Sequence, residues 1–463
     1  MLKLTHQKNN VLDTNNQIHT NSFVNAEKTF VPIARREFIN KIILQSREST
    51  TLERVKVQEL QTLIEILQTI YHARFHRHYI SLKNTYAPFN PDRDVVSKRN
   101  WSDEEKSCLQ GKLFREISAL LQKANYEELD ETSINIALND DMSRGLSIGV
   151  ELDDYQQVLI YNRGHGLIKT KKRKWRTLFL KEYDHEIAIY RRLTMVFRFR
   201  GVEQLSELLD QKGLNRFNKW LYLRRHERLM QDQNSDKFIF MSQFRDIPCS
   251  DLEMLFPNST LRFTLLDKIK LAATGGAGTV GGIMALLSKI ALAVKPLTIL
   301  IAIISFGTVL GRQVTNVLHQ QNHYKMVLSR SLFSHSLDIN LGVVASLLDQ
   351  ALDEEVKEAI LAYYILIQSP TEFLSADQIK IKVENFVQVH FKVDINFEVS
   401  DAIIKLRKDG LLIKNTKGYQ AIEPQAACTN LEAHWHDLYA STQKLAEVSY
   451  YTDVEGAKKK PAE

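Results

Sequence analysis

Cysteine is scarce in this chain of 463 residues. Its three cysteines, Cys108, Cys249 and Cys428, are far apart in the sequence and form no C-x-x-C pair. A disulfide framework or a zinc ribbon needs closely spaced cysteines, so the sequence argues against both. Three isolated thiols suit a reducing compartment.

Residues 1–25 lack the features of a targeting segment. They are rich in Asn, Gln and Thr, they contain no apolar run of the kind found in secretory signals, and the first arginine of the chain is Arg35. A segment with so few apolar residues buries too little surface to fold by itself. We therefore expect a disordered N-terminus over residues 1–25, and a disordered tail over residues 441–463.

A strong excess of charge and common enzyme motifs are also missing. The net charge is +6, with 44% hydrophobic and 25% charged residues, as in ordinary folded proteins. So mild a positive charge permits contact with anionic lipid or nucleic acid but requires neither. The sequence has no Walker A motif and no kinase-type set of motifs. We predict no cofactor, no metal and no catalytic residue, and we favour a non-enzymatic protein over an enzyme.

Long uncharged runs occur in one region of the chain. Eighteen uncharged residues lie between Lys270 and Lys289, and sixteen lie between Lys295 and Arg312. As helices they would be about 27 and about 24 Å long, close to the roughly 30 Å of a bilayer's hydrocarbon core. We therefore predict a transmembrane hairpin over residues 271–311. Two alternatives stay open: a buried helical hairpin in a soluble protein, and a single span over residues 290–311.

The arms of the predicted hairpin carry glycines at helical spacing. Gly278 and Gly282 are four residues apart, and so are Gly307 and Gly311. Small residues at this spacing let two helix backbones approach closely within lipid, where packing drives association. We predict that these glycines pack the two arms together, and the same spacings would support a homo-oligomer.

Basic residues flank the predicted hairpin more densely than they mark its turn. Arg262, Lys268 and Lys270 precede it, Arg312, Lys325 and Arg330 follow it, and Lys289 and Lys295 lie near the turn. Basic residues are enriched on the cytoplasmic side of membrane proteins. We therefore expect an integral membrane protein with membrane lipid as a partner and with both termini in the cytoplasm.

Hydrophobic periodicity divides the rest of the chain. Apolar residues recur at helical spacing in residues 31–82 and 102–129, and they alternate, as in strands, in residues 133–139, 146–152 and 237–244. The predicted fold class is α+β and mostly helical. Its parts are a helical domain (26–130), a small α+β module (131–243), a juxtamembrane segment (244–270), the hairpin, and a helical and winged-helix-like domain (312–440).

Helix-end signals are clear in the C-terminal part. The acidic residues 353–355 would open an apolar helix that runs to Ile367, since acids are favoured at the positive end of a helix. Ser375 and Gln378 would form the capping box of the next helix. Gly410 would end a third helix, because glycine adopts the left-handed conformation common just after a helix.

A two-stranded wing would follow these helices. Residues 411–422, LLIKNTKGYQAI, read as two short strands around a turn, so we predict a winged-helix-like module at about residues 355–423. A DNA reader of this kind needs a strongly basic recognition helix. The helix over residues 398–409 mixes basic and acidic residues, so we expect protein partners for this module and regard nucleic acid as the less favoured partner.

Six basic residues gather at residues 169–176, KTKKRKWR. They are Lys169, Lys171, Lys172, Arg173, Lys174 and Arg176, with Trp175 among them. Such a run can bind lipid headgroups or other phosphates, while the tryptophan rests at a membrane interface. We take it as the candidate lipid- or phosphate-binding site, with a solvated loop as the alternative.

Three carboxylates lie close together in FRDIPCSDLEMLFP, residues 244–257. Asp246, Asp251 and Glu253 could serve acid–base or cation chemistry. No histidine or nucleophile accompanies them at a telling spacing, so their role is left open. The alternative is an ordered turn before the membrane, with Asp251 capping a short helix.

Three histidines lie on one predicted helix. His72 and His76 are four residues apart, a spacing that can chelate a transition metal, and His78 follows. The glutamate of an H-E-x-x-H motif is missing. We expect surface or partly buried histidines here, without a metal.

Several stretches resemble one family. They are FVPIARREFI (30–39), YAPFNPD (86–92), VLIYNRG (158–164), FRDIPCSDLEMLFP (244–257), the glycine-rich hairpin, LDINLGVVASLLDQALDEEVKEAILAYY (337–364) and LEAHWHDLY (431–439). Together they resemble the domain of unknown function 3754 family, whose animal members are named transmembrane protein 143. The resemblance implies a membrane protein without an established activity, so it assigns no catalytic residue.

The favoured interpretation is a membrane-anchored adaptor or structural protein with cytoplasmic interaction modules. One rival is a membrane-tethered nucleic-acid-binding regulator that uses the winged helix. The other is a lipid-active enzyme at the membrane surface, which would combine the three carboxylates with the basic run.

Overall fold

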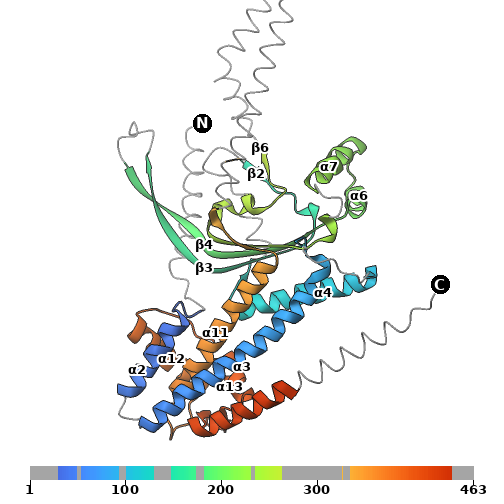
Figure 1. Ribbon diagram of the computed structural model, residues 1–463. Coiled ribbons are helices and arrows are strands. Elements are labelled where there is room, and N and C mark those ends of the chain that lie inside the picture. The colour runs from blue at the N-terminus through green and yellow to red at the C-terminus, as the bar shows by residue number, and fades with distance from the viewer. Residues whose placement is uncertain are drawn as a thin grey trace, which may run out of the picture. The chain divides into compact units, whose positions relative to one another are not determined.

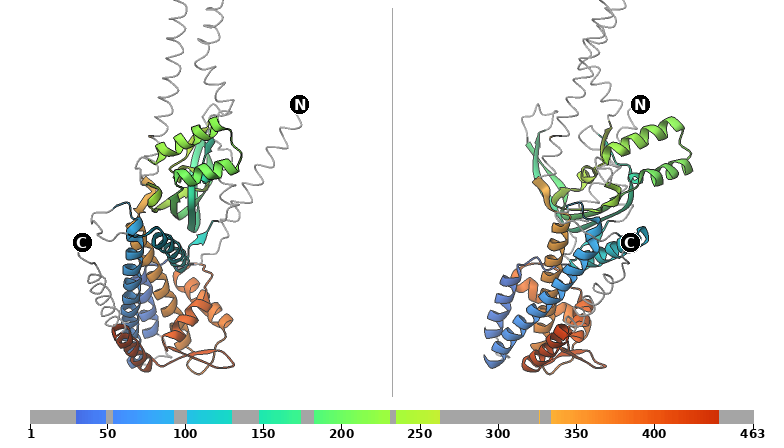
Figure 2. Two further views of the ribbon diagram at one scale, coloured as in Figure 1. Left: turned by 90° about the vertical axis from the view of Figure 1, so that its right-hand side faces the viewer. Right: turned by 45° about the vertical axis from the view of Figure 1, so that its right-hand side comes forward.

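The residues described by the computed structural model are 30–48, 54–92, 101–129, 147–173, 182–230, 235–262, 326 and 334–440. They form two compact units (Figures 1 and 2). The sheet unit comprises the described residues within 89–96 and 128–343, and the helical unit those within 25–88, 97–127 and 344–463. The predicted α+β fold class is confirmed.

Several predicted segments lie outside the described residues. They are the strand at 133–139, the hairpin at 271–311 and the disordered ends at 1–25 and 441–463. Among the helices that are described, none is both long enough and apolar enough to cross a bilayer. The transmembrane hairpin therefore stays a prediction.

A five-stranded sheet forms the centre of the sheet unit, in the order β1-β3-β4-β5-β7. Its strands are β1 (Glu127–Glu128), β3 (Tyr155–Arg173), β4 (Glu182–Phe199), β5 (Phe240–Pro248) and β7 (Ser336–Ile339). The pairs β3–β4, β4–β5 and β5–β7 are antiparallel, and β3 and β4 form a long hairpin (Figure 1). A second, two-stranded sheet pairs β2 (Ser147–Gly149) with β6 (Thr260–Arg262). The predicted strand at 237–244 is confirmed as β5.

Helices complete the sheet unit after β4 and around β5. α6 (Val202–Gln211) and α7 (Arg216–Leu229) follow β4 directly. Three short 3-10 helices are η2 (Leu152–Asp154), η4 (Ser235–Lys237) and η5 (Cys249–Leu255).

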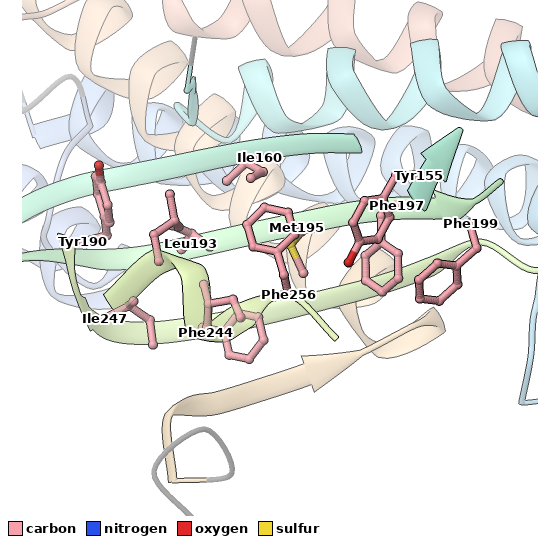
Figure 3. Packing of buried hydrophobic residues seen from close by; sticks show 12 residues of the cluster. Tyr155, Ile160, Tyr190, Leu193, Met195, Phe197, Phe199, Phe244, Ile247 and Phe256 are labelled. Carbon is pink, nitrogen blue, oxygen red and sulfur yellow. The ribbon is translucent and has the colours of Figure 1, made fainter. Parts of the chain in front are cut away.

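The core of the sheet unit lies on one face of the sheet. Successive side chains of a strand point to opposite faces, so alternate residues of β4 share this face. The buried cluster takes Leu193, Met195, Phe197 and Phe199 from β4, Tyr155 and Ile160 from β3, and Leu252, Leu255 and Phe256 from η5 and the residue after it (Figure 3). The ring of Tyr155 stacks on Phe199 with centroids 5.2 Å apart. The apolar residues of the stretch 244–257 therefore serve packing.

β7 is the edge strand of the sheet and pairs with β5. Ser242 lies opposite Ile339, and the Asn340 N–H that follows donates to the Met241 carbonyl at 2.8 Å. The side chain of Asn340 accepts from the Met241 N–H at 3.2 Å and donates to Asp92 Oδ2 at 2.6 Å. Asn340 has φ of 47°, a left-handed conformation that asparagine tolerates better than most residues. This residue thus fixes the chain to β5 just before the next helix.

The helical unit is built from long helices and a small hairpin. Its elements are α2 (Arg35–Glu48), α3 (Arg54–Tyr86) with η1 (Ala87–Phe89), α4 (Asp103–Lys123), α11 (Leu341–Ile367), α12 (Ala376–Phe391), α13 (Val399–Lys408), β8 (Leu412–Lys414) and β9 (Tyr419–Ala421). Residues 424–440 are helical as well. α3 runs alongside α11 (Figures 1 and 2).

α11 is the buried centre of the helical unit. Every residue from Glu354 to Ile367 is buried, although this stretch includes four charged side chains. A helix that is covered on all sides belongs to a protein core. Its charged residues must therefore find partners within the unit, because burying an unpaired charge is costly.

The structure corrects two predicted helix ends. α11 begins at Leu341, so the acids at 353–355 lie in its middle and do not open it. Asp353 pairs with Arg35 of α2, and Glu355 pairs with Lys405 of α13, partners that the local sequence does not reveal. α4 ends at Lys123 before residue 129, because Asn125 turns the chain with a φ of 57° and β1 follows.

The extended segment before α2 is bound to α11 through buried charges. Lys357 Nζ donates to the carbonyls of Val31 at 2.7 Å and Ile33 at 3.3 Å, and it pairs with Glu354 Oε1 at 2.6 Å. The Val31 N–H in turn donates to Glu354 Oε2 at 3.1 Å. Two stretches that carry the family resemblance, 30–39 and 337–364, therefore contact each other directly.

A second charged group joins α13 to α11. Lys405 Nζ lies 3.4 Å from Glu355 and 3.1 Å from Glu358, and Asp401 is a third carboxylate partner. Burial raises the pKa of Glu358 to about 7, against the opposing effect of Lys405. Burial alone would lower the pKa of Lys405, but the carboxylates outweigh it and raise this pKa above its usual value.

The predicted helix ends near the wing are confirmed. Ser375 and Gln378 form the capping box of α12, and Gly410, with φ of 68°, follows α13. β8 and β9 pair antiparallel, and Leu374 forms a bridge to Tyr419. Gly418 is required there, since a Cβ would lie within 2.2 Å of the Leu374 carbonyl oxygen.

Replacing Lys357 by Met should loosen the segment before α2. The variant leaves the buried Glu354 carboxylate without its cation, which typically costs about 3–5 kcal/mol. We expect a lower melting temperature and faster hydrogen exchange at the Val31 amide. Lys112→Met is the matched control, because Lys112 pairs with Glu116 at the surface and such pairs contribute about 0–1 kcal/mol. Equal falls in melting temperature for the two variants would contradict the role of Lys357 in holding the segment before α2.

Candidate functional site

A buried polar cluster, Asp154, Tyr155, His226 and Asn258, lies where η2, β3 and α7 meet the turn after η5. Each of the four side chains is at most 3% exposed. His226 Nδ1 lies 2.9 Å from Asp154 Oδ1. Asn258 Nδ2 donates to Asp154 Oδ2 at 2.8 Å, and the Tyr155 hydroxyl donates to Asn258 Oδ1 at 2.7 Å.

Backbone groups complete the polar cluster. His226 Nε2 lies 2.8 Å from the Arg200 carbonyl, and Asn258 Nδ2 also donates to the Glu151 carbonyl at 2.6 Å. Both ring nitrogens of His226 thus face oxygen atoms, Asp154 Oδ1 on one side of the ring and the Arg200 carbonyl on the other. Burial raises the pKa of Tyr155, which keeps its hydroxyl protonated as a donor.

This arrangement suits support of the fold better than catalysis. A catalytic acid or base must reach the substrate with a proton or lone pair to exchange. In the polar cluster the side-chain nitrogens and oxygens of Asp154, His226 and Asn258 are all engaged with each other or with the backbone. A satisfied, buried network of this kind makes the local structure rigid.

Basic side chains extend the polar cluster toward α6 and α7. Arg200 donates to the carbonyls of Asp153 and Tyr155, both at 3.0 Å. Arg225 donates to the Asn258 carbonyl at 3.3 Å, and Lys212 pairs with the Asp153 carboxylate. These contacts fix the two helices to the end of the sheet.

The side of α7 opposite the polar cluster is exposed and apolar. Phe217 lies nine residues before His226, which at about 100° per residue places it on the opposite side of the helix. Phe217, Trp220 and Leu221 are 70%, 52% and 55% exposed. This surface could not be predicted from the sequence, because the exposed face of α7 depends on which face the polar cluster holds inward.

The predicted basic run begins in a strand. Lys169, Lys171, Lys172 and Arg173 belong to β3, whereas Lys174 and Arg176 lie outside the described residues. Residues 169–173 therefore lie in a strand, and their role in binding lipid or phosphate stays a prediction. In the β3–β4 register Lys169, Lys171 and Arg173 lie opposite Glu186, Asp184 and Glu182. Acidic residues thus accompany the basic ones along this hairpin.

The three predicted carboxylates are spread over two elements. Asp246 lies in β5 with φ of 50°, whereas Asp251 and Glu253 lie in η5, Glu253 being buried. Asp251 does not cap η5, since Pro248 occupies the cap position without a side-chain bond. Within the described ranges, no group of three or more His, Cys, Asp or Glu side chains is placed to hold a metal ion.

The three predicted histidines lie on α3, as expected. The ring of His76 is near Tyr79, with centroids 6.4 Å apart, and the ring of His78 is near Phe75 at 6.3 Å. Burial, followed by the charge of Lys123, lowers the pKa of His78. The glycines predicted to pack helices, Gly278, Gly282, Gly307 and Gly311, lie outside the described residues.

Two short strings match general enzyme patterns without their structural context. Gly145–Gly149, GLSIG, fits the G-x-S-x-G pattern of hydrolases, which places its serine on a sharp turn from a strand into a helix. Ser147 instead begins β2, which pairs antiparallel with β6. Gly276–Gly281, GAGTVG, fits G-x-G-x-x-G but lies outside the described residues.

Replacing His226 by Leu should detach α7 from the sheet. The change leaves the buried Asp154 carboxylate without this hydrogen-bond partner, at a cost of about 1–3 kcal/mol. We expect faster hydrogen exchange along α7 and a lower melting temperature. Glu227→Leu is the control, since it places the same side chain at the exposed neighbouring position. Unchanged protection of α7 in His226→Leu would show that the polar cluster does not hold this helix.

Part of the chain matches a known protein family. Residues 155–342 match the family described as "Protein of unknown function (DUF3754)", and this match confirms the resemblance seen in the sequence. The matched stretch begins at β3 and ends just after β7. No solved structure matches the chain significantly. Over residues 155–342 the chain is therefore similar to the DUF3754 family of proteins of unknown function.

Proposed function

We propose that the chain is a membrane-anchored, non-enzymatic adaptor whose C-terminal module binds other proteins. The observation that carries the proposal is the pairing of Lys405 with the acids of α11, because it removes a basic charge from the helix that would otherwise read DNA. The membrane anchor is the predicted hairpin at residues 271–311.

The order of elements supports a winged-helix-like module. α11 is followed by the bridge residue Leu374, by α12 and α13, and by the β8–β9 hairpin. The bridge from Leu374 to Tyr419 adds a third strand position to the hairpin, which is how a wing is attached to its helices. In such a module α13 occupies the place of the recognition helix.

The surface of this module favours a protein partner. A recognition helix in the major groove needs basic side chains that point toward the DNA. Lys405 instead contacts Glu355 and Glu358, and the exposed basic residues of α13 are Arg407 and Lys408 in its last turn. Ile404 is 64% exposed on the same helix, and exposed apolar residues suit the centre of a protein interface.

The path of the chain supports a hairpin over a single span. The chain leaves the described part at Arg262, the end of β6, and β7 begins at Ser336. β6 pairs with β2 and β7 pairs with β5, all within the sheet unit. A single span would separate these strands by a bilayer, whereas a hairpin returns the chain to the side on which it began.

A titration with duplex DNA tests the choice between a protein partner and nucleic acid. For the full chain in detergent we expect only non-specific affinity, with dissociation constants of about 10⁻⁴–10⁻⁶ M at physiological salt. Nanomolar, sequence-dependent binding that is lost in Arg407→Gln would instead establish the nucleic-acid-binding alternative. Lys417→Gln, on the exposed wing turn, is the matched control.

Topology reporters test the hairpin. Reporters fused near residue 25 and after residue 440 should report the same compartment, because two spans return the chain to its original side. Reporters in opposite compartments would replace the hairpin with a single span.

A further inference from the structure

The outer face of α7 is an exposed apolar surface without a partner in the described part of the chain. Phe217, Trp220 and Leu221 follow the i, i+3, i+4 spacing of one helix face, and the Phe217 and Trp220 rings lie 6.2 Å apart. Single exposed apolar residues are common, but a contiguous group with two aromatic rings marks a contact surface. α6 and α7 stand out from the sheet as a helical pair (Figure 2).

Positive charge surrounds this surface. α7 carries five basic residues, Arg216, Lys219, Arg224, Arg225 and Arg228, against the single acid Glu227. Lys219 pairs with Asp210, and Arg225 donates to Asn258. The other three are exposed beside the apolar residues. The Arg224 guanidinium lies 5.1 Å from the centre of the Trp220 ring.

The polar cluster prevents this face from turning inward. His226 lies on the opposite side of α7 and is held by Asp154 and by the Arg200 carbonyl. Rotating α7 to bury Trp220 would break both contacts and expose the polar cluster. The apolar face is therefore fixed outward, where a partner can meet it without rearrangement.

We propose that Phe217, Trp220 and Leu221 insert into the interfacial region of an anionic lipid bilayer, with Arg216, Arg224 and Arg228 contacting lipid phosphates. Aromatic residues favour this region, and helices with Trp, Phe or Leu on one face and Lys or Arg beside them lie in it. Guanidinium groups bind phosphates in a bidentate way. α7 is a second contact with the membrane, and the inference rests on the proposed anchor at residues 271–311.

Lipid suits this surface better than a protein does. A stable protein interface buries about 800 Å² on each partner, far more than three side chains provide. A membrane contact can be small when another segment already anchors the chain, because two weak membrane signals combine into stable attachment. The excess of arginine also complements anionic headgroups, each basic residue near the surface adding to the attraction.

Fluorescence of Trp220 in lipid nanodiscs tests this inference. The full chain is reconstituted into discs of phosphatidylcholine with phosphatidylserine, with or without bromine on the acyl chains. The difference between the wild type and Trp220→Phe isolates the emission of Trp220 from that of the three other tryptophans. We expect brominated lipid to quench this emission, and we expect less quenching in discs of phosphatidylcholine alone.

Variants of α7 give the matched comparison. Leu221→Asp should abolish the quenching of Trp220, whereas Asn218→Asp, the same charge change at an exposed position on the flank of the helix, should preserve most of it. Arg224→Gln should remove much of the dependence on phosphatidylserine.

The outcomes separate the inference from the proposed anchor. A chain that fails to enter the discs contradicts the anchor itself. A chain that enters them while Trp220 stays open to aqueous acrylamide and unaffected by brominated lipid keeps the anchor and overturns the inference. That second outcome would leave the face to a protein partner or to a second copy of the chain.

Discussion

The pairing of β7 with β5 is the constraint on which the account of the whole chain depends. The two strands are separated by the long uncharged region, yet Ser242 and Ile339 lie opposite each other and Asn340 hydrogen-bonds twice to Met241. Whatever residues 271–311 do, the chain must return to the sheet unit. For the proposed membrane anchor this return requires an even number of crossings, and both ends of the matched family stretch lie in the sheet unit.

In the helical unit, buried charged side chains join segments that are far apart in the sequence, as the β5–β7 pairing does in the sheet unit. α11 is enclosed by protein, and its Lys357 pairs with Glu354 of the same helix while Lys405 of α13 pairs with its Glu358. Lys357 also donates to the carbonyls of Val31 and Ile33, so both charged groups join α11 to segments far away in the sequence. Such pairs add little net stability compared with apolar residues, but breaking one partner is costly. They therefore specify which segments meet.

Local chemistry in the sequence predicted local structure well. The capping box at Ser375, the glycine after α13 and the two short strands within residues 411–422 depend on neighbouring residues, and all three are confirmed. The predicted start of α11 at residues 353–355 was wrong, because these acids lie within the helix and are stabilised by partners such as Lys405 from another helix.

The polar cluster could not be predicted from the sequence for the same reason. Asp154 and His226 are 72 residues apart, and Asn258 is a further 32 residues on, so no motif spacing connects them. The polar cluster holds one face of α7 inward and so leaves the apolar face exposed. That exposed face therefore could not be predicted from the sequence either. The candidate carboxylates were adjacent in sequence, but Glu253 is buried in η5 while Asp246 lies in β5.

The central claim is that the chain crosses a bilayer and returns to the same side. Thiol labelling in sealed, uniformly oriented vesicles tests it most directly, using a membrane-impermeant maleimide on a chain whose Cys249 and Cys428 are replaced by serine. The exposed native Cys108 reports the side of the folded units, and Ala293→Cys reports the predicted turn between Lys289 and Lys295. The account predicts that these two thiols react from opposite sides of the membrane. Reaction of both from the same side would show that residues 271–311 do not cross it.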